Sequence, residues 1–98
     1  MSDQQIILYK DQIENDLKYL NIGIKEKNKF SILYFYNSLI ENIEEFINID
    51  PSSVGGVLFQ SELLIKFDQR KNILRDIIKK DFNLCLSYST NFKMIYSF

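Results

Sequence analysis

The residues best placed to do chemistry in this 98-residue sequence are acidic, and they lie close together. Glu41, Glu44 and Glu45 fall within about one and a half turns if this stretch is helical. Helical spacing places them on one polar stripe with an aromatic and two amide side chains. The stripe consists of Tyr34, Asn37, Glu41, Glu44, Glu45 and Asn48.

We predict that this stripe binds a protein partner. No Lys or Arg occurs between Phe30 and Ile65, so nothing nearby in the sequence offsets the three glutamates. Tyr34 is a large amphipathic residue of the type enriched at interaction hot spots. Acidic charge beside it would steer the approach of a basic partner. The alternative is an ordinary solvated face, whose charge is balanced in space by the lysines of residues 25–29.

A second charged group is basic and lies further along the chain. It consists of Arg70, Lys71, Arg75, Lys79 and Lys80. Three of these recur every four residues, hence on one helical stripe that could bind phosphates or an acidic partner. Interleaved aspartates and a net charge of -1 dilute the field, so we interpret this group as a solvated face and expect no nucleic-acid partner.

Two further segments could be functional sites, but we interpret both as structural. Residues 52–56 contain two glycines, whose backbone N–H groups could hold an anion at a helix start. A phosphate loop would place a lysine soon after, and the next one is Lys66, so we predict a flexible turn after Pro51. Cys85 has no second cysteine to pair with and no feature that would activate it, which indicates an inert thiol.

The sequence lacks the equipment of most enzymes. It contains no His, which removes the commonest general base, and one Cys, which cannot provide a zinc site. No nucleotide-binding or calcium-binding motif is present. We therefore expect no catalytic, cofactor-binding or metal-binding residues and no enzyme activity, although a carboxylate-pair or Tyr-Lys enzyme stays open.

The elements that must position the acidic stripe are helical. Apolar residues recur at spacings of three and four over residues 3–21, with Asp16 on the polar side and Gly23 suited to end the helix. Residues 29–48 form a more apolar helix, with Tyr36 and Ile43 in the core, that Pro51 ends. A strand over residues 30–36 is the competing interpretation, because its residue types favour strands.

The second half of the sequence is less regular. Residues 52–68 fit a helix or a strand, and residues 62–67 alternate as a strand would. Residues 69–81 fit a helix. Alternating runs over residues 82–88 and 92–98, joined by three polar residues, predict a β-hairpin, to which residues 62–67 would add a third strand.

The predicted fold class is therefore α+β. An N-terminal antiparallel helix pair packs with a third helix and a small C-terminal antiparallel β-hairpin or sheet, in one compact domain over residues 1–98. The 46% hydrophobic content supports a packed core. The single Cys and the absence of a leader or long apolar run predict a cytoplasmic protein without membrane association.

Size, missing catalytic residues and the acidic stripe together favour a protein that binds another macromolecule. We expect an immunity protein or an antitoxin-like factor that neutralises a basic toxin or effector. The abundance of Ile, Lys, Asn, Phe and Tyr, typical of an AT-rich gene, fits a microbial or viral source. The alternative is a structural or assembly subunit, a homodimer formed through the C-terminal hairpin with Phe92 and Phe98 in its interface.

Overall fold

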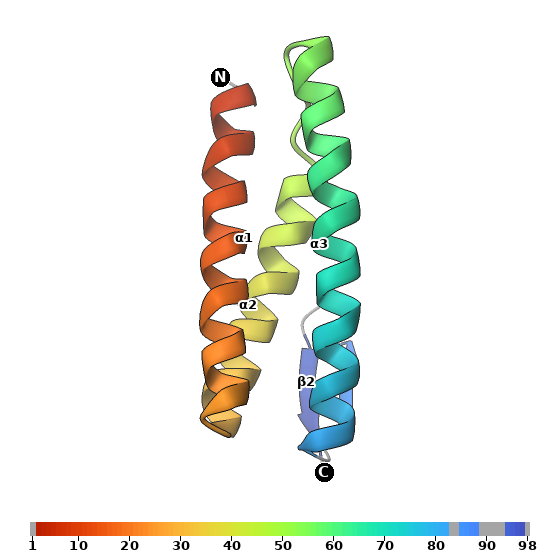
Figure 1. The fold of residues 1–98 in the computed structure, drawn as a ribbon. Coiled ribbons are helices and arrows are strands. Elements are labelled where there is room, and N and C mark those ends of the chain that lie inside the picture. The colour runs from red at the N-terminus through yellow and green to blue at the C-terminus, as the bar shows by residue number, and fades with distance from the viewer. Residues whose placement is uncertain (1, 83–84, 89–93, 98) are drawn as a thin grey trace.

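Three long helices make up most of the protein (Figure 1). The computed structural model describes residues 2–82, 85–88 and 94–97, with the side chains of residues 3–82. Helix α1 spans Ser2–Lys25, α2 spans Lys29–Ile47 and α3 spans Val54–Asp81. They run side by side and alternate in direction, as short connections require.

Helix α1 packs through an apolar line with one residue every two turns. Ile6, Ile13 and Leu20 are all at most 1% exposed and face the other helices. We expected Gly23 to end the helix, but the helix continues to Lys25. The residue with a positive φ, of 57°, is Lys27 in the turn that follows. Gly23 instead permits close packing, since a Cβ there would lie 3.2 Å from the Ser31 Cβ of α2.

Helix α2 is the central helix, as its apolar sequence predicts, and the strand alternative for residues 30–36 is wrong. Asn28 caps its start by accepting a hydrogen bond from the Ser31 N–H at 3.2 Å. Tyr36 and Ile43 are buried in the core, as predicted. Six of the nineteen residues are buried, namely Ile32, Tyr36, Leu39, Ile40, Ile43 and Phe46.

Helix α3 is longer than the predicted helix over residues 69–81. It begins at Val54 with Ser53 as its N-cap, so residues 52–56 are the cap and first turn of a helix and not a flexible turn. Residues 62–67 lie within α3, and the predicted third strand is wrong. Leu63, Phe67 and Leu74 recur at helical spacing on its buried side, and this face overrides the short alternating pattern.

The predicted α+β class is wrong, and the protein has an all-α fold. The helices contain 24, 19 and 28 residues, and the core described above is built from them alone. Near the C-terminus the backbone forms two four-residue strands, β1 (Cys85–Tyr88) and β2 (Met94–Ser97). They pair antiparallel, with Cys85 opposite Ser97. The side chains of residues 83–98, including Cys85, Phe92 and Phe98, lie outside the described residues.

Candidate protein-binding face

The six residues of the predicted stripe lie along the outer side of α2, and we call them the acidic face. Tyr34, Glu41, Glu45 and Asn48 are exposed, while Asn37 and Glu44 are partly buried. The Asn48 side chain donates to the Glu44 carbonyl at 3.1 Å and so helps to end the helix. The helix thus brings all six together, as its spacing predicts, although it buries them to different degrees.

Aromatic side chains flank the acidic face at the N-terminal half of α2. Tyr34 is 68% exposed and makes an edge contact with Phe35, with ring centres 5.0 Å apart. Phe35 in turn stacks on Tyr19 of α1 at 5.3 Å. Phe30, one turn before Tyr34, is 87% exposed. Phe30 extends the same line by four residues, and the i, i+4 spacing would have identified it from the sequence.

The three glutamates occupy the other half of α2, near its C-terminal end. Glu45 Oε2 accepts a hydrogen bond from the Tyr9 hydroxyl of α1 at 2.7 Å. This bond favours the protonated phenol and raises the pKa of Tyr9. Glu44 faces the third helix and lies at the edge of a groove between α2 and α3. Neither Glu44 nor Glu45 takes part in an ion pair among the described residues, where the acids that do include Asp11, Glu14 and Asp68.

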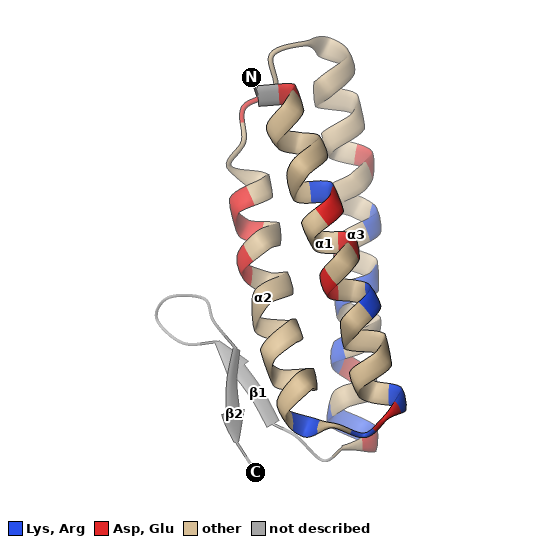
Figure 2. Ribbon diagram, turned by 90° about the vertical axis from the view of Figure 1, so that its left-hand side faces the viewer, with Lys and Arg blue, Asp and Glu red and all other residues tan. Residues whose placement is uncertain are grey.

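The lysines expected to balance these glutamates lie at the opposite end of α2. Figure 2 shows basic residues at the α1–α2 turn and acidic residues at the far end of α2. Glu41 follows Lys29 by twelve residues of helix, or about 18 Å along the axis. That separation exceeds the screening length of roughly 10 Å at 0.1 M salt. The lysines of residues 25–29 therefore offset the negative charge of these glutamates only weakly.

A buried aspartate, which the sequence interpretation placed on a polar outer side, lies between α1 and α2. Asp16 is only 6% exposed. Its Oδ2 accepts hydrogen bonds from Ser38 Oγ at 3.0 Å and from Asn42 Nδ2 at 2.7 Å. Burial raises the pKa of this carboxyl, and the two hydrogen bonds act in the opposite direction. The sequence analysis missed this contact, for which Ser38 and Asn42, two polar residues one turn apart on α2, are the signal in the sequence.

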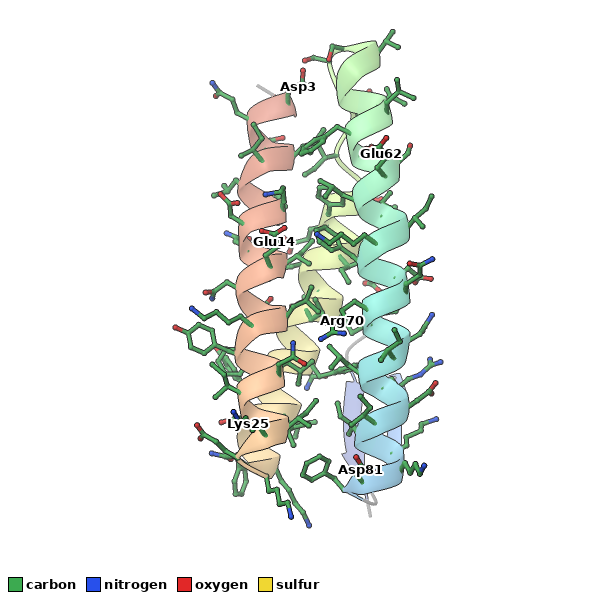
Figure 3. The ribbon with its side chains drawn as sticks, in the orientation of Figure 1. Asp3, Glu14, Lys25, Glu62, Arg70 and Asp81 are labelled. Atoms are coloured by element: carbon green, nitrogen blue, oxygen red, sulfur yellow. The ribbon has the colours of Figure 1, made fainter. Side chains whose placement is uncertain are left out.

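The glycine-bearing segment does hold an anion, and the anion belongs to the protein itself. Asp3 of α1 accepts hydrogen bonds from the Ser52 N–H and the Ser53 hydroxyl, both at 3.0 Å. These donors, led by the Ser52 backbone, lower the pKa of Asp3. Figure 3 shows Asp3 at the end of α1 that adjoins the start of α3. The contact is a structural tie between the helix ends.

The basic residues of α3 are distributed around the helix and partly engaged within the protein. Lys71 forms an ion pair with Asp68 at 3.0 Å, and its side chain is only 17% exposed. Arg70 donates to the Asn21 side chain of α1 at 3.4 Å. Arg75 is partly buried, and its Nε has no acceptor among the described residues. The predicted stripe of Lys71, Arg75 and Lys79 is therefore only partly available to solvent.

No protein family, curated protein or solved structure matches this chain, so its function has to be inferred from the geometry described here. In the described part of the chain, no helix is long and apolar enough to cross a membrane. The same residues contain no group of three or more acidic, Cys or His side chains arranged to hold a metal ion.

Proposed function

We propose that this protein is a protein-interaction module and that the acidic face of α2 binds a basic region of another protein. The observation that carries the proposal is the position of Glu41, Glu44 and Glu45 toward the C-terminal end of α2. The helix dipole places partial negative charge on the last turn, so Glu44 and Glu45, which lie in that turn, each cost about 0.3–1 kcal/mol. Glu41 adds to the same negative charge one turn earlier. The last turn of α2 contains no basic residue to offset this cost.

No ion pair among the described residues brings positive charge to Glu44 or Glu45. Glu45 accepts one hydrogen bond from Tyr9 of α1, and Glu44 borders a groove. Residues that break a local stability rule without compensation mark sites where function sets the sequence. A basic protein surface would supply the missing positive charge, and Tyr34 and Phe30 on the same face would supply apolar contact.

The basic residues of α3 do not support a competing nucleic-acid interface. Lys79 and Lys80 lie in the last turn of α3, where the helix dipole favours positive charge. Their placement thus has a structural explanation, which the glutamates of α2 lack. Asp68, Asp76 and Asp81 on the same helix reduce the local positive potential. We therefore propose a protein as the partner and not a nucleic acid.

The proposal is limited to binding. Inhibition of the partner, as by an immunity protein or an antitoxin, would be a further step, and no feature of the described residues is specific to it. A homodimer formed through the C-terminal hairpin concerns side chains outside the described residues. Absence of enzyme activity and a cytoplasmic setting stay predictions that rest on the missing His and the single Cys.

The test is affinity capture from lysate with three baits, followed by washes of increasing salt and mass spectrometry. The baits are the unaltered protein, the variant E41K/E44K/E45K, and the control E26K/E62K/D76K, which has the same net charge. Glu26, Glu62 and Asp76 are exposed and lie outside α2. We expect one stoichiometric partner with the unaltered protein and the control, lost at high salt and absent with the first variant. Equal capture by both variants would contradict the proposal.

A further inference from the structure

An open groove of about 380 Å³ lies between α2 and α3 beside the acidic face. Its floor is apolar and consists of Ile40, Ile43 and Ile47 of α2 and Leu64 of α3. Ile47 is 54% exposed and therefore offers a large apolar surface in this groove. The volume is at the low end of the range for binding pockets, roughly 300–1,000 Å³.

The spacing of the lining residues fits a helix better than a compact small molecule. On α2 the apolar residues recur at i, i+3 and i+7, and on α3 the lining residues Leu64, Asp68 and Lys71 recur at i, i+4 and i+7. The groove therefore follows both helices for seven residues, about 10 Å. A bound helix presents its anchors over the same distance, at i, i+4 and i+7.

The charge at the edges of the groove selects a basic occupant. Glu44 forms the α2 edge, with Glu41 one turn before it on the same side of the helix. On the α3 edge, Asp68 and Lys71 form an ion pair at 3.0 Å and largely cancel each other. The net charge beside the groove is thus negative and belongs to α2. An occupant with Lys or Arg on its α2 side would complement it.

A second copy of this chain would bring no such charge through the exposed apolar line of α3. That line is formed by Val54, Leu58 and Ile65, which are 79%, 63% and 61% exposed. The stretch from Phe30 to Ile65 contains no Lys or Arg, and Lys66, which follows it, forms an ion pair with Glu14 of α1 at 3.9 Å. This line could fill the apolar floor, but it would leave the acidic edge without a counter-charge.

We propose that the α2–α3 groove receives an amphipathic basic helix of the partner protein. Apolar side chains of that helix, one or two turns apart, contact Ile43, Ile47 and Leu64, and a Lys or Arg pairs with Glu44. The inference rests on the proposed function, because it specifies how the basic partner is recognised at the acidic face. It adds a requirement that charge alone does not impose, namely an apolar anchor held in helical geometry.

The experiment titrates the full-length, isotope-labelled protein with synthetic peptides and follows backbone NMR signals. The first peptide is a fourteen-residue amphipathic helix of Leu and Lys. A second has the same composition in scrambled order, so that no apolar face forms, and a third replaces Lys with Glu. We expect the first peptide to bind most tightly and to shift the signals of Ile43, Ile47 and Leu64.

Matched variants locate the contact. Ile47→Ser should weaken binding of the amphipathic basic peptide about 10-fold, while Ile73→Ser should not, because Ile73 is similarly exposed (50%) but lies in the groove between α1 and α3. Glu44→Lys should weaken binding by a similar factor, and Glu62→Lys should leave it unchanged. Figure 3 shows Glu62 on α3. Since Ile47 is exposed, both serine variants should keep the melting temperature of the unaltered protein.

Each other outcome rejects a defined part of the account. Equal binding of the scrambled peptide, dependent on Glu44 but not on Ile47, would overturn the groove inference and leave the proposed function intact. Equal binding of the Glu peptide would remove the charge preference and with it both proposals. No binding by any peptide would overturn the groove inference, while the capture experiment would still judge the proposed function. Concentration-dependent self-association that shifts the same signals would assign the groove to a second copy.

Discussion

Gln60 shows how a single side chain holds the end of a helix that is remote in sequence. The residue is 8% exposed, and its Nε2 donates to the carbonyls of Phe46 at 2.8 Å and Ile49 at 2.9 Å. The Ile49 carbonyl lies just after the end of α2, and the Phe46 carbonyl in the last turn of α2 also accepts from the Ile49 N–H at 3.3 Å. Gln60 of α3 thus fixes the end of α2 from which the acidic face extends.

We expect Gln60→Leu to lower the free energy of unfolding by about 2 kcal/mol, since it removes two hydrogen bonds made by a buried side chain. The matched control is Gln69→Leu, an exposed position on the same helix, which should change the stability little. Chemical denaturation monitored by circular dichroism measures both. Equal stability of the two variants would show that the Gln60 hydrogen bonds contribute little.

Asp16 makes the stability of the protein depend on pH in a defined direction. Because burial raises its pKa in the folded state, the folded protein binds more protons than the unfolded chain between the ordinary pKa and the raised one. The contribution of Asp16 to the free energy of unfolding is therefore fully present below its pKa in the unfolded chain. It is lost as the pH rises through its pKa in the folded protein.

The variant Asp16→Asn should lose this pH dependence while keeping an acceptor for Ser38 and Asn42. Asp11→Asn, at an exposed position of the same helix, should retain it. Denaturation curves recorded at intervals from pH 3 to pH 8 compare the three proteins. If the Asp16 variant followed the same pH profile as the unaltered protein, the buried carboxyl would not be the titrating group.

At the scale of elements, the two glycines of the first turn of α3 have different surroundings. A Cβ at Gly55 would meet only Ser53 Oγ at 3.9 Å, whereas a Cβ at Gly56 would lie 2.6 Å from Asp3 Oδ1. Both glycines are helical, and neither has a positive φ. Gly56 therefore makes room for the Asp3 tie between α1 and α3, while Gly55 has no such role.

We expect Gly55→Ala to raise the free energy of unfolding by about 0.5–1 kcal/mol through helix propensity. Gly56→Ala should fall short of this gain, because the new methyl group displaces Asp3. In an Asp3→Ala background, the difference between the two alanine substitutions should shrink to the effect of Pro51, whose Cβ lies 3.2 Å from a Cβ at position 56. This double-mutant cycle isolates the Asp3 contact. A Gly56 variant as stable as the Gly55 variant in the unaltered background would show that Asp3 relaxes at no cost.

The elements also show which parts of the fold the sequence could predict. The helix over residues 29–48 was predicted almost to the residue, because its apolar pattern is long and has clear end signals at Asn28 and Pro51. The start of α3 was missed, because Gly55 and Gly56 resemble a turn and the tie to Asp3 is a long-range contact. The strand over residues 62–67 was wrong, because a short alternating run cannot outweigh a buried helical face built from Leu63, Phe67 and Leu74.

The candidate site was predictable in part, because it lies on the helix whose bounds were predicted best. Helical spacing alone placed the six residues of the acidic face on one side of α2. It could not show that residues 25–29 lie at the far end, that Glu45 bonds to Tyr9, or that Asp16 is buried. The groove depends on how α2 and α3 pack together, which is a tertiary property, so Ile47 has no distinguishing signal in the sequence.

At the scale of the whole molecule, the protein is elongated. Its principal extents are 44, 28 and 18 Å, and its radius of gyration of 14.1 Å exceeds the roughly 13 Å expected for a compact chain of this length. The longest helices, α1 and α3, run along the long axis, and the acidic end of α2 lies beside them (Figure 2). This arrangement separates the acidic end of α2 from the basic residues in the last turn of α3 and at the α1–α2 turn, which suits a face that recognises a basic partner.

The most direct test of the account is the salt dependence of the dissociation constant for the captured partner, measured with the purified proteins. The account predicts that affinity falls steeply as salt rises for the unaltered protein and for E26K/E62K/D76K. The variant E41K/E44K/E45K should show little binding even at low salt. If that variant bound the partner with unaltered affinity and salt dependence, the acidic face of α2 would not be the binding site.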